Sequence, residues 1–239
     1  MRYSVLGEGK RIRPILALAA CEAVGGSVKK ALPAACALEL IHAYSLVHDD
    51  LPAMDDDDVR RGRPSCHKKY GEALGVLTGD ALLTYSFELL ASGGNGDSAV
   101  RLKVIREIAK AIGTQGMIGG QVVDIESGSG RSRGAVMEYI NSRKTGALIS
   151  ASVRIGALMG GATPKQYQAI SSYGDKVGLV FQLVDDQLDR DGAVRLYGVR
   201  AVRERAQSLT RSAVNSLRMF GSKGRSLEAL AFFILTRNS

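Results

Sequence analysis

The chain has 239 residues, of which 45% are hydrophobic and 23% charged, a composition typical of a globular domain and unlike disordered or fibrous chains. A formal net charge of +8 suits an anionic partner, whereas 5% aromatic residues and no Trp disfavour base stacking on single-stranded nucleic acid. Three cysteines without metal-ligand spacing favour a reduced, cytoplasmic protein over a disulfide framework. We also expect no signal peptide and no membrane span, since no apolar run approaches about 20 residues.

Helix signals dominate the chain, because good helix formers run between glycine or polar breaks. The expected helices cover residues 14–24, 31–48, 72–91, 99–118, 135–160, 164–188, 199–218 and 226–237, with glycine-rich breaks at 92–98, 127–134 and 160–164. The segment 31–48 is apolar almost all round, which indicates a buried helix. Because no alternating strand pattern occurs and no linker divides the chain, we expect one all-α domain over residues 1–239.

An acidic motif, HDDLPAMDDDDVRRGRP, covers residues 48–64 and places six aspartates within ten positions. An isolated acidic run is usually a solvated loop. This one follows a helix too apolar to be exposed, so we expect the carboxylates at its end to line a cavity. Paired carboxylates repel one another unless a cation lies between them, and Mg²⁺ prefers carboxylate oxygens together with water and phosphate.

The spacing inside this motif predicts a break in the helix. Asp49 and Asp55 are six residues apart, so on a regular helix they would point about 120° away from a common face. Pro52 lies between them and has no N–H with which to continue the helix. A break or bulge at this point would bring Asp55 back beside Asp49, where both could face one ion.

A second acidic motif, FQLVDDQLD, covers residues 181–189. Asp185 and Asp189 share one face of the expected helix, Asp186 flanks them, and like charges at this spacing destabilise an isolated helix. A helix end facing solvent would also explain this motif taken alone. Two such clusters, each closing an apolar helix, instead predict two walls of one cavity, with divalent cations bridging to a polyphosphate.

Basic residues accompany both acidic motifs. The segment GKRIRP covers residues 9–14, Arg60 and Arg61 follow the first motif directly, and Lys144 is followed by Thr145. Arg binds phosphate oxygens with two parallel hydrogen bonds, and Lys supplies a point charge. Basic groups beside metal-binding acids fit a diphosphate better than a calcium site. They fit nucleic acid poorly, because they are dispersed and no binding motif occurs.

Together these stretches resemble the trans-isoprenyl diphosphate synthases, and most closely the bacterial-type farnesyl diphosphate synthases. The matching residues are 9–14, 39–73, 77–84, 118–127, 143–149 and 178–189, which span almost the whole chain. The resemblance implies an all-α isoprenoid-synthase fold, a bundle of long helices around a deep apolar cavity, usually as a homodimer. It implies a Mg²⁺-dependent condensation of isopentenyl diphosphate with an allylic diphosphate (dimethylallyl or geranyl) to give farnesyl diphosphate and diphosphate.

The resemblance also assigns roles to individual residues. Three Mg²⁺ ions per active site are implied when substrate is bound, with the metal ligands Asp49, Asp55, Asp185 and Asp189 and with Asp50 in support. The implied isopentenyl diphosphate site consists of Lys10, Arg13, His42 and Arg61. The implied allylic site consists of Arg60, Lys144, Thr145 and Gln182, with Lys144 on the leaving diphosphate. No strong protein base is evident, so we expect the released diphosphate to take the proton.

Tyr44 and Ser45 are the expected chain-length residues. Tyr44 lies five positions before Asp49, a little over one helical turn, on the side where the growing hydrocarbon points. A ring there would form a floor that a C15 chain reaches and a C20 chain cannot pass, although without the resemblance a core aromatic is the favoured interpretation of Tyr44. The alternatives are a geranylgeranyl diphosphate synthase and a non-catalytic regulatory subunit. The second motif, DDQLD, disfavours a terpene cyclase.

Two departures from the family pattern concern missing segments. In the family a further helix precedes MRYS, and a lysine-containing loop follows the second motif. Here Asp189 runs directly into RDGAVRLYGVRAVRERA. We expect the complete protein to carry both segments, whereas a true deletion of the loop would put activity in doubt. An intact mass equal to 25.4 kDa would contradict this expectation.

Overall fold

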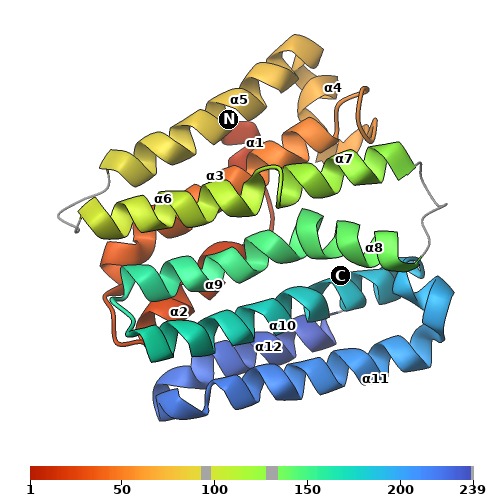
Figure 1. Ribbon diagram of the computed structural model, residues 1–239. Helices are drawn as coiled ribbons and strands as arrows, with labels where there is room; N and C mark the ends of the chain where they lie inside the picture. Colours follow the sequence, from red (N-terminus) through yellow and green to blue (C-terminus); the bar gives the residue numbers. More distant parts are fainter. Residues whose placement is uncertain (93–97, 128–133, 238–239) are drawn as a thin grey trace.

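The computed structural model describes residues 1–92, 98–127 and 134–237, and confirms the all-α class (Figure 1). The helices are α1 Arg2–Val5, α2 Ile12–Ala23, α3 Val28–Asp49, α4 Cys66–Tyr70, α5 Glu72–Ser92, α6 Ser98–Ile112, α7 Met117–Ser127, α8 Gly134–Asn141, α9 Ala147–Met159, α10 Pro164–Asp189, α11 Ala193–Ser216 and α12 Arg225–Thr236. A π-helical turn, η1 Ser142–Gly146, joins α8 to α9, and a 3₁₀ segment, η2 Arg218–Gly224, joins α11 to α12. The strands β1 Val59–Arg60 and β2 Arg63–Pro64 form a small antiparallel hairpin.

Helix ends follow local chemistry, and so do the departures from the expected helices. α10 begins with a reciprocal capping box between Thr163 and Gln166 and has Pro164 in its first turn. The expected helix 99–118 ends at Ile112, and α7 was not foreseen as a helix. The expected helix 135–160 is interrupted by η1. The breaks expected at 92–98 and 127–134 fall largely outside the described residues.

The short, largely buried helix α9 joins two hydrophobic cores. One of its faces packs into a core with α3, α5 and α6, and the opposite face packs into a core with α2, α10 and α12. Its many small residues let neighbouring helices approach on both sides, because packing at native density follows the size of the facing side chains. As a result α3 and α10, which end in the two acidic motifs, belong to one packed body (Figure 1).

Two helices correct the expectation that no apolar run is long enough to cross a membrane. Val28–Asp49 and Glu72–Ser92 both reach that length and hydropathy, by composition alone. The most apolar window of α3 is 56% buried, which is typical of a core helix, but that of α5 is only 28% buried. Helix α5 therefore leaves apolar side chains exposed, among them Leu74 and Leu77.

The chain after the second motif turns back at once. Arg190 has a left-handed backbone conformation, and the N–H of Ala193 donates to Asp186 Oδ2 at 2.8 Å. Only three residues therefore separate the end of α10 from the start of α11. A short turn anchored on Asp186 thus joins the second acidic motif to α11.

Candidate active site

The first acidic motif folds into a turn that places two aspartates side by side. Helix α3 ends at Asp49, and the backbone N–H of Asp55 donates to the Asp49 carbonyl at 2.8 Å. This is the return of Asp55 that the spacing and Pro52 predicted. Burial, together with the charges of Asp55 and Asp50, raises the pKa of Asp49 to about 6 although Lys144 opposes it. Carboxylates held together in this way fit a divalent cation such as Mg²⁺.

Asp50 and Arg60 bind each other rather than face the cleft separately. Arg60 Nε donates to Asp50 Oδ1 at 2.8 Å, and its Nη2 also binds Asp50 and reaches Asp57 Oδ2 at 2.8 Å. The Asp50 side chain is almost fully buried, so it requires this partner. The pair fixes the hairpin that carries Arg60 and Arg61 against the end of α3.

A basic cavity of about 680 Å³ brings together the four residues implied for isopentenyl diphosphate. Its lining includes Lys10, Arg13, His42 and Arg61. Burial lowers the pKa of Arg13 to about 10. Burial and the neighbouring Arg13 and Arg61 lower the pKa of His42 well below its usual range, so this histidine is neutral. Glu8 and Glu39 also line the cavity, and Glu39 pairs with Arg11. The basic side chains still outnumber the acidic ones, so the lining suits an anion.

The π-helical turn η1 positions Lys144 and Thr145. Lys144 Nζ donates to Asp124 Oδ2 at 2.9 Å, and the charges of Asp124, Asp49 and Asp55 outweigh burial and raise the pKa of Lys144. Gly120 of α7 makes this approach possible, because a Cβ there would lie 2.6 Å from the Lys144 backbone nitrogen. Single π-turns inside helices are frequent at functional sites.

The second acidic motif differs in how its carboxylates are engaged. Asp185 Oδ1 lies 2.6 Å from Arg237 Nη2, and Arg237 also stacks over the Phe181 ring. Asp186 is buried and accepts hydrogen bonds from Gln182 Nε2 at 2.8 Å and from the Ala193 N–H. Asp189 is exposed. Asp185 is thus paired with a cation of the chain itself, while Gln182 is held by Asp186.

Three residues at this site were not foreseen from the sequence. Arg237 lies 52 positions after Asp185 and belongs to no motif, so nothing in the sequence indicates their pairing. Asp124 and Gln121 lie within the matched stretch 118–127, where their polar character amid glycine and apolar residues is a usable signal. The amide nitrogen and oxygen of Gln121 are buried and have no hydrogen-bond partner among the described residues.

Tyr44 and Ser45 lie on α3 behind the acidic motif. The Tyr44 side chain is 5% exposed, and its ring meets that of His48 edge to face at 5.9 Å. Burial and the nearby charge of Asp49 raise the pKa of Tyr44 to about 12. Its hydroxyl has no partner among the described residues, and Ser45 Oγ donates to the His42 carbonyl at 3.0 Å. The geometry is compatible with both the core role and the chain-length role of Tyr44.

Comparison with known proteins identifies the class. The polyprenyl synthetase family model matches residues 1–198, so the chain belongs to the polyprenyl synthetase family. It is 44% identical to heterodimeric geranylgeranyl pyrophosphate synthase large subunit 1 of Arabidopsis thaliana, covering 100% of this chain and 71% of the relative. It is 42% identical to geranylgeranyl diphosphate synthase of Cyanophora paradoxa, covering 100% of this chain and 87% of the relative.

Solved structures agree with this assignment. The apo structure of an FPP/GFPP synthase from Zymomonas mobilis superposes with a TM-score of 0.93 at 38% identity, covering 98% of this chain and 86% of that one. The fold is therefore the isoprenoid-synthase fold, and the protein is a trans-prenyltransferase by family. The names of these relatives refer to products of different lengths, so similarity alone does not determine the hydrocarbon length of this protein's product.

Proposed function

We propose that the protein catalyses the Mg²⁺-dependent condensation of isopentenyl diphosphate with an allylic diphosphate. The observations that carry this proposal are the basic cavity lined by Lys10, Arg13, His42 and Arg61 and the turn that returns Asp55 to Asp49. The charge of Asp185, from the second acidic motif, acts on Arg13 of this cavity. Cations for one diphosphate and metal ligands for another are both required by such a reaction. The proposal rests on these residues and on the family.

Each group of residues has a distinct task in the reaction. Mg²⁺, when bound by Asp49, Asp55 and Asp185, would supply charge stabilisation for the leaving diphosphate. Lys144, which is close enough to Asp49 and Asp55 for their charges to raise its pKa, supports the same negative charge. The basic cavity orients isopentenyl diphosphate so that its double bond attacks the allylic carbocation. Because His42 is neutral, it contributes hydrogen bonding and adds no further positive charge near the carbocation.

For the product we propose geranylgeranyl diphosphate. The relatives from Arabidopsis and Cyanophora that match the whole chain are both named geranylgeranyl diphosphate synthases, which supports C20 over the farnesyl product expected from Tyr44. Farnesyl diphosphate remains the second candidate, because Tyr44 is a buried aromatic one turn and a half before Asp49, and because the Zymomonas neighbour is named an FPP/GFPP synthase.

Product chromatography tests this choice. Purified protein is incubated with isopentenyl diphosphate and each allylic primer, and the dephosphorylated products are separated by length. We expect mainly C20 from the parent and, in Tyr44→Ala, C20 or longer. A parent that makes mainly C15, with a shift to C20 in Tyr44→Ala, would replace our proposal by the farnesyl one. Tyr197→Ala, an exposed tyrosine on α11, serves as the matched control and should leave the product unchanged.

A catalytically silent regulatory subunit is the alternative from another class. The name of the Arabidopsis relative includes a heterodimeric large subunit, so partner subunits occur among the relatives. Metal ligands in both motifs favour an active enzyme, since a silent subunit does not require them. Mg²⁺-dependent release of diphosphate by the purified chain alone would support the enzyme, and no release under any primer would support the subunit.

We also propose a homodimer that covers α5. Leu74, Leu77 and Tyr85 on this helix are 53%, 60% and 45% exposed, an apolar surface that a second copy would remove from water. Light scattering after size exclusion should give twice the intact mass of one chain measured by mass spectrometry. Leu77→Lys should shift the mass toward the monomer, whereas Leu102→Lys on α6 tests whether the interface extends there. The cytoplasmic location stays a prediction.

A further inference from the structure

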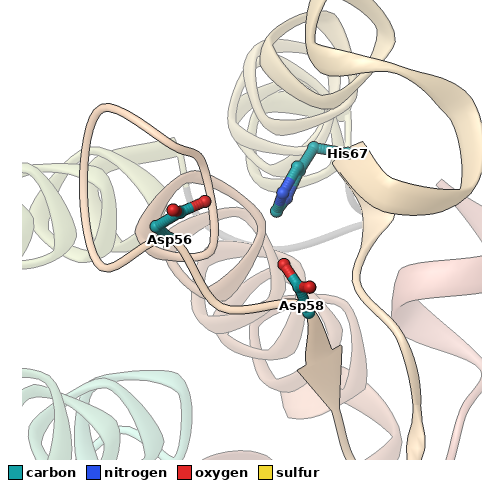
Figure 2. A group of neighbouring side chains, drawn as sticks. All are labelled: Asp56, Asp58 and His67. Carbon is teal, nitrogen blue, oxygen red and sulfur yellow. The ribbon is translucent and has the colours of Figure 1, made fainter.

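Asp56, Asp58 and His67 form a group that the prenyltransferase site does not use. Each offers a possible metal-ligand atom, and these atoms all lie within 4.8 Å of one another. Figure 2 shows the imidazole of α4 directed between the two carboxylates of the preceding loop. We propose that these three side chains form a further metal site, one that takes a transition-metal ion such as Zn²⁺ in preference to Mg²⁺.

The imidazole of His67 is the strongest evidence. The residue is only 5% exposed, and its Nε2 has no hydrogen-bond partner among the described residues. Its Nδ1 lies 3.0 Å from Ser65 Oγ. With the proton on Nδ1, donated to Ser65, the lone pair of Nε2 is free for a metal, which is the arrangement of most metal-bound histidines. A buried nitrogen without a partner otherwise destabilises the fold.

Backbone hydrogen bonds and helix packing hold the three ligand residues in position. The N–H of Ser65 donates to the Asp58 carbonyl at 2.8 Å, which closes the hairpin and brings Asp58 and His67 to its open end. Helix α5 packs closely against His67, since a Cβ added at Gly75 would lie only 3.2 Å from the His67 Cβ. The N–H of Asp56 donates to the Leu51 carbonyl at 3.1 Å. The histidine is therefore fixed, and only two exposed carboxylates must adjust.

The donor set determines the class of metal. One imidazole and two carboxylates suit Zn²⁺, Co²⁺ or Mn²⁺, and leave a position for water in a tetrahedral site. Mg²⁺ prefers oxygen ligands alone, as at Asp49 and Asp55. Lys68 Nζ lies 2.8 Å from Asp58 Oδ1 and competes with an ion for that carboxylate. Removing the ammonium group should strengthen the site.

A bound ion would join the loop that follows Asp55 to α4. The loop would then be held by a metal as well as by backbone hydrogen bonds. This inference does not depend on the proposed reaction, because metal binding can be measured without substrate. If the metal site fails its test, the proposed reaction is unaffected, and the reverse also holds.

Co²⁺ titration in an excess of Mg²⁺ tests the site. The magnesium occupies oxygen-only sites, and Cys36→Ser removes the exposed thiol. We expect one Co²⁺ per chain, with visible absorption bands and a paramagnetically shifted, exchangeable imidazole N–H signal in the proton NMR spectrum. His67→Gln and Asp56→Asn should each weaken binding at least about tenfold. Lys68→Met should strengthen it about two- to fivefold.

Two matched variants control the experiment. Asp57→Asn removes a neighbouring exposed carboxylate that binds Arg60, and His48→Gln removes a histidine whose Nε2 already lies 3.0 Å from the Val76 carbonyl. Both should retain the imidazole signal. If His67→Gln does not fold, the exposed Asp56→Asn variant decides. Absence of stoichiometric Co²⁺, a signal that survives in Asp56→Asn, or one that disappears only in His48→Gln would overturn the proposal.

Discussion

The two acidic walls of the site differ in what neutralises them. At the end of α3, Asp49 and Asp55 are brought together by a backbone hydrogen bond, and burial raises the pKa of Asp49 to about 6. At the end of α10, Asp185 is already paired with Arg237 at 2.6 Å. Among the described residues Asp49 and Asp55 therefore form no direct ion pair, although the charges of Lys144 and Arg60 act on Asp49, whereas Asp185 contacts a cation directly.

This difference teaches that the two walls need not bind metal in the same way. The first wall gains by binding a divalent cation, because the ion removes repulsion between carboxylates. At the second wall a metal must displace Arg237 or share Asp185 with it. We therefore expect metal to bind at the first wall more readily in the absence of substrate.

Removing a carboxylate from either wall should have the largest effect. Asp49→Ala and Asp185→Ala should each lower turnover on the order of 10²–10³-fold or more, by analogy with the loss of one charge-stabilising contact in a transition state. Steady-state kinetics with varied Mg²⁺ measures this loss, and circular dichroism checks the helical fold. Near-full turnover with unchanged Mg²⁺ dependence would remove the metal assignment.

Asp175 provides a matched control for the second wall. It lies on the same helix as Asp185, and its Oδ1 also accepts from an arginine, Arg154 Nη2, at 2.6 Å. Asp175→Ala should leave turnover within about twofold, since an exposed ion pair contributes little. An equal loss in both variants would mean that Asp185 acts through the stability of α10.

The pH dependence of stability should report on His42 and on the arginines that surround it. Burial, and to a smaller extent the charges of Arg13 and Arg61, keep the pKa of His42 well below 6.5 in the folded chain. Below about pH 6.5 the unfolded chain therefore binds a proton that the folded chain does not, so the free energy of unfolding falls as pH decreases. Between pH 7 and pH 5, wild type should therefore lose more free energy of unfolding than His42→Gln. Urea unfolding at both pH values measures the difference, and parallel losses would show that His42 is protonated in the folded state.

Removing Arg237, the ion-pair partner of Asp185 in the second wall, should have the smallest effect. Arg237→Met removes the internal cation, so Asp185 should bind metal more tightly, by about two- to tenfold, because a partly exposed ion pair is weak. Titration of the substrate-free protein with Mn²⁺, followed by electron paramagnetic resonance, measures the change. Arg225→Met, an exposed arginine on α12, controls for net charge. Unchanged or weaker Mn²⁺ binding in Arg237→Met would mean that the pair does not oppose the metal.

Much of the fold and of the site could be predicted from the sequence, because the signals were local or repeated. Apolar helices bounded by glycine gave the all-α class, and the six-residue spacing around Pro52 gave the return of Asp55 to Asp49. The four residues implied by the resemblance for isopentenyl diphosphate do line one cavity. These are properties of short segments.

The remaining features depend on contacts between distant segments. The pairing of Arg237 with Asp185 joins the last helix to α10, and no spacing rule connects the two. The π-turn at η1 depends on how α7 and α10 pack against it, so helix propensity alone predicted one continuous helix over 135–160. The β1–β2 hairpin is held by Arg60 on a buried Asp50, again a contact that propensity does not contain.

The π-turn Ser142–Gly146 has a consequence for how the chain tolerates deletions. Such a turn holds one residue more than the α-helical turn it replaces, and each residue rotates a helix by about 100°. Losing any single residue here would let α8 and α9 fuse smoothly, and the helix itself would suffer little. Lys144, however, would be rotated by about that angle, away from Asp124. A deletion of one residue would therefore break the contact between Lys144 and Asp124, which no conservative substitution of the lysine could do.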